Sequence, residues 1–160
     1  MSNVEQASTL CTSCGMCCDG SLFSFVALST EEARTLRIQG VDVRDEGGFL
    51  KLPQRCGALE GCRCTIYEKR PYVCRRFDCL LVRSLTEKEL PLDEALQIVS
   101  DARAKLNRLD GLLPKRKPSD PSGAVLRAAT LAQTGTPVSD SARRAFDEAQ
   151  EHLRRHFVPD

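Results

Sequence analysis

Thiol side chains are the groups most able to do chemistry in this sequence. The chain of 160 residues has nine cysteines, two methionines and no tryptophan, and all nine cysteines lie between Cys11 and Cys79. An odd number of cysteines cannot be used up by a closed set of disulfides. The first ten residues lack the basic and apolar pattern of a secretion signal, so we expect a reducing, cytoplasmic compartment. Metal ligation by thiolates is therefore the expected chemistry.

The first four cysteines have a spacing that is typical of metal ligands. Cys11, Cys14, Cys17 and Cys18 form a C-x2-C-x2-C-C block, and C-x2-C is the spacing at which one turn lets two thiolates bind one cation. Adjacent side chains in extended backbone point to opposite sides, so Cys17 and Cys18 are expected to face different sites. Two four-sulfur sites would use eight of the nine thiols. Three zinc ions with bridging sulfurs would need all nine and are the less favoured arrangement.

Zinc and an iron–sulfur cluster both remain open as the occupant. A four-thiolate zinc site contributes about 10 to 16 kcal/mol of folding energy in small domains. The first 83 residues need such a contribution because they contain few large apolar side chains. Cys11, Cys14 and Cys17 also have the C-x2-C-x2-C phase of bacterial ferredoxins, but the C-x3-C-P continuation is absent. Zinc is slightly favoured for its effect on stability.

Basic side chains are interleaved with the later cysteines. A four-thiolate zinc site or an oxidised four-iron cluster carries a net charge of about minus two. Nearby guanidinium groups and backbone amides are expected to offset that charge. The candidates are Arg55, Arg63, Lys69, Arg70, Arg75 and Arg76.

The cysteine part of the sequence resembles the CxxCxxCC cysteine cluster family (YkgJ-type), proteins named for chelating zinc or iron. The resemblance covers about residues 11–79. It rests on the opening block with Gly15 inside it, a middle Cys56, and the closing segments C-T-I-Y-E-K-R-P (64–71), C-R (74–75) and F-D-C (77–79). The family pattern implies eight metal ligands: Cys11, Cys14, Cys17, Cys18, Cys56, Cys64, Cys74 and Cys79. Cys62 is then extra, and Arg70 and Arg75, which lie in the matched pattern, are the expected donors toward the bound group.

The resemblance implies metal binding and says little about a reaction. A bacterial flagellin lysine methylase looks similar in its cysteine region, so one alternative is an iron–sulfur redox protein or a component of a protein-modifying enzyme. A zinc-built interaction module is another. Motifs of common hydrolases and nucleotide enzymes are missing. The balance of 23 basic and 22 acidic side chains argues against nucleic-acid binding, and no apolar run is long enough to predict a membrane span.

An α+β fold is expected, with a metal-stapled, loop-rich cysteine module over residues 8–83 and a helical extension over 84–160 packed on it. In the module, residues 23–28 predict a short strand. Ser29 and Glu32 form a capping box that opens a helix ending at Gly40. Residues 41–52 predict a hairpin whose tip is D-E-G-G (45–48), and residues 56–79 are expected to be mostly loops.

The second half predicts three helices. Apolar side chains recur every 3.6 residues over 92–109, with Asp110-Gly111 as the end, and further helices are expected over 124–133 and 139–157. Residues 114–123, rich in proline, serine and charge, are interpreted as a connector. The apolar stripes are expected to pack against one another. The alternative is that they present a face to a protein partner.

Overall fold

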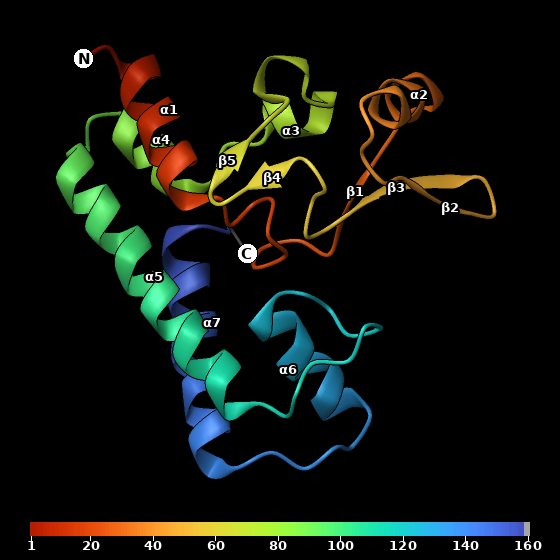
Figure 1. Cartoon of the computed structure of the whole chain (residues 1–160). Coiled ribbons are helices and arrows are strands. Elements are labelled where there is room, and N and C mark those ends of the chain that lie inside the picture. Colours follow the sequence, from red (N-terminus) through yellow and green to blue (C-terminus); the bar gives the residue numbers. More distant parts are fainter. Residues whose placement is uncertain (159–160) are drawn as a thin grey trace.

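The computed structural model describes residues 1–158 and is a mixed helix and sheet structure, which confirms the α+β prediction (Figure 1). The helices are α1 (Asn3–Cys14), α2 (Thr30–Ile38), α3 (Tyr72–Arg76), α4 (Leu80–Thr86), α5 (Leu92–Leu112), α6 (Ala124–Gln133) and α7 (Asp140–His156), with a 3-10 turn η1 (Tyr67–Lys69). The strands are β1 (Phe25–Ala27), β2 (Arg44–Glu46), β3 (Phe49–Pro53), β4 (Leu59–Glu60) and β5 (Arg63–Cys64).

A three-stranded antiparallel sheet, in the order β1-β3-β2, contains the predicted hairpin. Gly47 and Gly48 form its turn with φ values of 65° and 89°, and two successive positive φ angles are the signature of the type I′ turn that joins twisted strands. The first hairpin strand begins at Arg44, later than the predicted residue 41. Val41 instead follows the end of α2, where its N–H donates to Leu36 O. Its side chain is buried in the same apolar cluster as Leu36.

Capping boxes begin both of the early helices. The Ser29–Glu32 box opens α2 as predicted. A second box, formed by Ser2 and Glu5, opens α1, a helix that the sequence pattern did not predict. Helix α1 matters for the site because it carries Cys11 and Cys14 on its last turn.

The three predicted helices of the second half are confirmed as α5, α6 and α7. Helix α5 continues past the predicted end through Gly111 to Leu112. The apolar stripes of α5 and α7 are buried where these helices pack side by side (Figure 1). The stripe on α7 is thus used in packing, and this face gives no support to the hypothesis of a protein partner. Residues 114–123 form the connector between α5 and α6.

Two apolar clusters hold the molecule together. The larger cluster joins α1, α4, α5, α6 and α7 and includes the fully buried Leu10, Met16 and Phe157. The smaller one joins α2, β3 and residues 56–59 and centres on Leu36 and Leu52. Side chains from both halves of the sequence contribute to the larger cluster, and a module boundary at residue 83 stays a prediction. Within the part of the chain that the structure describes, no helix has the length and apolar character needed to cross a membrane.

Candidate metal centre

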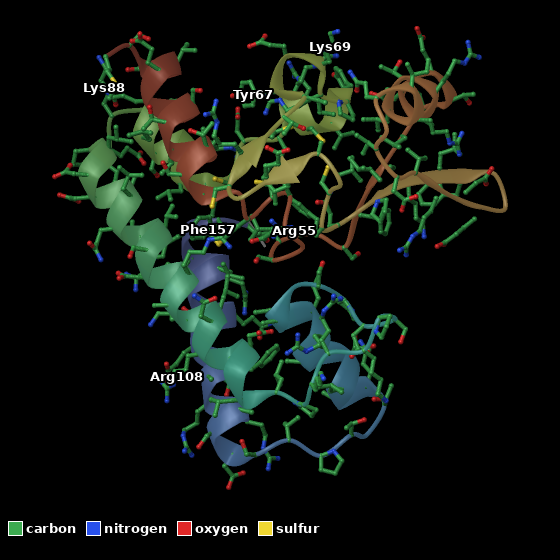
Figure 2. The ribbon with its side chains drawn as sticks, in the orientation of Figure 1. Arg55, Tyr67, Lys69, Lys88, Arg108 and Phe157 are labelled. Carbon is green, nitrogen blue, oxygen red and sulfur yellow. The ribbon has the colours of Figure 1, made fainter. Side chains whose placement is uncertain are left out.

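All nine cysteines line one cavity of about 290 Å³. Their sulfur atoms come from the end of α1, the turn after it, the β3–β4 connection, the β4–β5 hairpin with its turn, and the segment from η1 to α4. Figure 2 shows sulfur gathered between α1 and the β4–β5 hairpin. None of the nine is in a disulfide. The tertiary fold therefore brings together thiols that lie up to 68 positions apart in the sequence.

The rest of the cavity wall is mainly apolar. Phe23 and Phe77 pack edge to face, with ring centroids 4.9 Å apart, and connect the loop after Cys18 to the loop before Cys79. Much of the remaining wall consists of apolar side chains from several segments of the chain: Val26, Leu52, Ile66, Val73, Leu81, Val82 and Phe157. Such a lining lowers the local dielectric and makes charged thiolates costly unless a cation accompanies them.

Four thiols form the first set, which we call group A: Cys11, Cys14, Cys17 and Cys79. Burial raises the pKa of Cys11 to about 11 and of Cys14 to about 12, and repulsion from Cys79 adds to both increases. Burial also raises the pKa of Cys17, with contributions from Cys14, Cys79 and Cys11. Group A is assembled because α4, which begins just after Cys79, packs against α1.

The second set, group B, contains Cys18, Cys56, Cys64 and Cys74. Burial raises the pKa of Cys18 to about 12, and repulsion from the other three members adds to the increase. Burial raises the pKa of Cys74 to about 11, with further contributions from Cys56 and Cys64. The backbone fixes part of this group, since the N–H of Cys56 donates to Cys18 O at 2.7 Å.

Cys17 and Cys18 each interact most strongly with thiols of a different group, and the sequence argument that places them at different metal sites stays a prediction. The backbone responsible is a turn, in which the N–H of Cys18 donates to Gly15 O, and not the extended segment on which that argument was based. Repulsion from Cys18 helps to raise the pKa of Cys17, so the thiols of the two groups also act on each other. The two sets are therefore neighbours within one cavity.

Buried thiols with raised pKa values are neutral at ordinary pH, so metal binding would have to displace their protons. Sets of four thiols in an apolar cavity suit zinc and iron–sulfur clusters, since both bind four cysteines. Among residues 1–158, however, no three Cys, His, Asp or Glu side chains already lie close enough to hold a single ion. The donor set fits these groups in chemistry and number, and the eight ligand assignments stay predictions.

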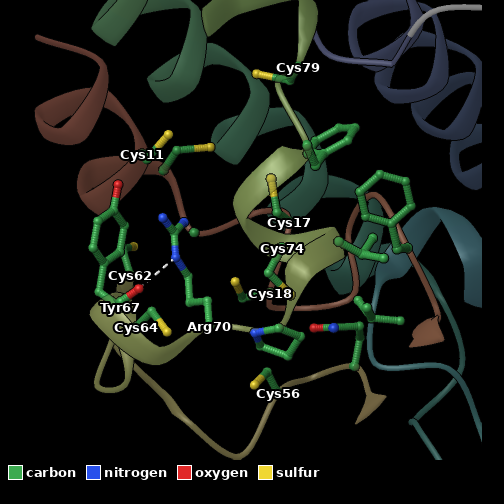
Figure 3. A pocket seen from close by; sticks show the side chains of 18 of the residues that line it. Cys11, Cys17, Cys18, Cys56, Cys62, Cys64, Tyr67, Arg70, Cys74 and Cys79 are labelled. Atoms are coloured by element: carbon green, nitrogen blue, oxygen red, sulfur yellow. Dashed lines mark hydrogen bonds between the residues drawn. The ribbon is translucent and has the colours of Figure 1, made fainter. Parts of the chain in front are cut away.

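Arg70 lies between the two thiol groups (Figure 3). Its charge lowers the pKa of Cys11 in group A and of Cys74 in group B, although burial outweighs this effect at both thiols. The guanidinium stacks on the ring of Tyr67, 3.6 Å from the centroid, and its Nε donates to Tyr67 O at 2.8 Å. Tyr67 is a packed aromatic residue that holds the cation in place.

Arg75 and Cys62 take other positions. Arg75 is exposed on α3. The N–H of Ser29 is the main cause of the lowered pKa of Glu32, and the charge of Arg75 adds to the decrease. Its predicted role toward a bound group is untested. Cys62 lines the cavity but interacts with Arg103, which also acts on Cys14. The structure thus separates Cys62 from the Cys64 that follows it by two residues.

Arg103 of α5 is a residue near the thiols that the sequence analysis did not identify. A signal was present, because position 103 lies on the same stripe as the buried Val99 and Leu106, where a charged side chain is unusual. Arg103 spans the boundary between α5 and the cysteine turn. A charged residue on an apolar helix stripe could have been marked as a candidate partner for the thiols.

The decisive comparison is with protein families. Residues 10–95, more than half of the chain, match the CxxCxxCC family, described as a putative zinc- or iron-chelating domain. The chain belongs to this family. The matched range contains both thiol groups of this CxxCxxCC protein and Arg70, whereas Arg103 and most of α5 to α7 lie beyond it. No curated protein and no solved structure matches the chain.

Proposed function

We propose that this CxxCxxCC protein holds metal in two four-thiolate sites, group A and group B, which share one cavity. The observation that carries the proposal is the division of eight free thiols, three from buried and five from partly buried cysteines, into two sets of four around a mainly apolar space. A reducing cytoplasmic location is part of the proposal, since free thiols persist where disulfides do not form.

The surroundings of the thiols would favour a bound cation over protons. A divalent ion would displace the thiol protons to solvent, and its positive charge would offset the repulsion between the resulting thiolates of a group. Arg70 would offset the remaining negative charge of both sites, because it already acts on one thiol of each. The apolar wall would keep water from the sulfurs.

An iron–sulfur cluster is the second candidate occupant. It is also bound by four cysteines, and Cys11, Cys14 and Cys17 have the C-x2-C-x2-C phase of bacterial ferredoxins. Zinc stays slightly favoured because a four-thiolate zinc site would stabilise the fold. Elemental analysis and the visible absorption of protein purified without air distinguish the two occupants, because only the cluster is coloured.

The adjacent cysteines provide a matched test of the two-site arrangement. Cys17→Ser and Cys18→Ser alter neighbouring positions in one turn, so their general effects on folding should be similar. Each variant should lose about half of the bound metal, Cys17→Ser from group A and Cys18→Ser from group B. The Cys17→Ser/Cys18→Ser double variant should bind almost none.

Variants at distant positions check the membership of each group. Adding Cys79→Ser to Cys17→Ser should cause no further loss of metal, because both substitutions damage group A. Adding Cys56→Ser to Cys17→Ser should remove the remaining metal. The two-site proposal is contradicted if either single variant loses all of its metal, or if the unsubstituted protein contains no stoichiometric zinc or iron.

A further inference from the structure

Arg103 connects α5 to the turn that follows Cys14. Its Nη1 lies 2.5 Å from Asp19 Oδ2, its Nη2 donates to the backbone oxygen of Cys14, and the same nitrogen lies 3.8 Å from Cys62 Sγ. The Arg103 side chain is 31% exposed and that of Asp19 only 9%. One guanidinium therefore contacts three positions around the thiol cavity from a residue that lies beyond the family match.

The partners of Arg103 are themselves fixed. Asp19 Oδ1 accepts the N–H of Ser21 at 2.8 Å, and the N–H of Asp19 donates to Gly15 O at 3.1 Å. The guanidinium thus holds both ends of the segment from Cys14 to Asp19. Between those ends lie Cys17 and Cys18, so the fork sets the shape of the turn that divides the two groups.

The positive charge of Arg103 acts on group A. Arg103 acts electrostatically on Cys14, a member of group A, whereas the other thiol on which it acts, Cys62, belongs to neither group. A four-thiolate site on a divalent ion has a net charge of about minus two. A forked cation that also contacts the backbone of a ligand can offset this charge and orient the ligand together.

We propose that Arg103 is a positioning residue for metal binding by group A, supplied by the helical half of the chain. The inference rests on the proposed function of group A as a metal site. It assigns α5 a role in the metal centre that the matched family range does not cover, because that range ends at residue 95.

The test uses full-length Arg103→Gln and Arg103→Lys, with cobalt(II) as a visible probe of thiolate coordination and a competing chelator to measure affinity. The Cys18→Ser background leaves group A intact, and Cys17→Ser leaves group B intact, so each group can be titrated alone. Arg103→Gln should weaken binding by group A about 10- to 100-fold, the usual cost of losing a group that orients a metal ligand, and weaken group B much less, although Cys18 lies in the same turn. Arg103→Lys should recover part of the loss, because it restores the charge without the fork.

Arg108→Gln is the matched control. Arg108 lies on the same helix, is 59% exposed and pairs with Glu148 at 3.4 Å, away from the thiols. Asp19→Asn provides a second variant, which should weaken group A. The Asp19→Asn/Arg103→Gln double variant should be little weaker than Arg103→Gln alone, because Arg103→Gln already removes the contact with Asp19.

The possible results separate this inference from the proposed function. Unchanged cobalt affinity of group A in Arg103→Gln overturns the inference while leaving the two sites standing. Equal weakening of both groups, with no recovery in Arg103→Lys, also overturns it by showing a general effect on folding. If the unsubstituted chain and Arg108→Gln bind no cobalt, the proposed function fails and this inference fails with it.

Discussion

Replacing Gly15 with alanine should destabilise the turn that carries the metal ligands. Gly15 ends α1 with φ +66°, and a Cβ at this position would stand 2.9 Å from the backbone Cα of Cys62. A left-handed conformation costs an L-residue about 1–2 kcal/mol, and forcing a methyl group into packed backbone costs about 1–3 kcal/mol more. Gly15→Ala should therefore lower the free energy of unfolding by about 2–5 kcal/mol.

Gly135 offers a closely matched control. It follows α6 with φ +69°, and no atom lies within 4 Å of its would-be Cβ, so Gly135→Ala should cost only the conformational term of about 1–2 kcal/mol. Urea denaturation under reducing conditions, followed by far-ultraviolet circular dichroism, measures both losses. The difference between them reports the contact with Cys62, and equal losses would refute the argument that this close approach constrains the turn.

Three further predictions concern the thiols, the last helix and the bound metal. Cys62→Ser should remove less metal than Cys64→Ser, and equal losses would contradict the placement of Cys64 in group B. Burial and repulsion from His152 lower the pKa of His156, so His152→Gln should raise it in an NMR titration. Stability should fall as pH drops below about 6.5, because the unfolded state then takes up the proton more readily. A chelator with a reducing agent should speed amide hydrogen exchange in β1 and β3 and leave α5 protected.

Local signals explain the elements that could be predicted from the sequence. The stripes of α5 and α7, the Ser29 capping box and the Gly47-Gly48 turn each depend on residues a few positions apart. The interactions that form these elements lie within one or two turns of backbone, so the sequence pattern indicates the structure directly.

The missed helices α1 and α4 have too few apolar side chains to show a clear helical period, although Ser2 and Glu5 at the start of α1 form the same local signal as Ser29 and Glu32. In α1 the buried side chains are Leu10 and Cys14, too few to show a 3.6-residue period. In α4 the buried Leu81, Val82 and Leu85 form a short run directly after Cys79. Helix formation here is determined by packing of α1, α4 and α5 against one another, which a single sequence does not display.

The candidate site was predicted in its residue types but not in its pairing. The family resemblance named eight thiols, and simple backbone geometry suggested that Cys17 and Cys18 face apart. Which distant cysteine joins which group depends on tertiary contacts. Packing of α1 with α4 places Cys79 in group A, and the hydrogen bond from the Cys56 N–H to Cys18 O holds group B together.

The two thiol groups contact different parts of the apolar core. We therefore expect the two parts of the fold to depend on bound metal to different extents. Cys14 and Cys79 of group A belong to the larger cluster, which α5 and α7 stabilise whether or not metal is bound. Cys56 of group B belongs to the smaller cluster, which has six buried residues and packs against a sheet of short strands. So small a core buries too little surface to offset the entropy of ordering its chain. A metal bound by group B would connect this cluster to the segment after Cys18, so the sheet should depend on metal more strongly than the helices do.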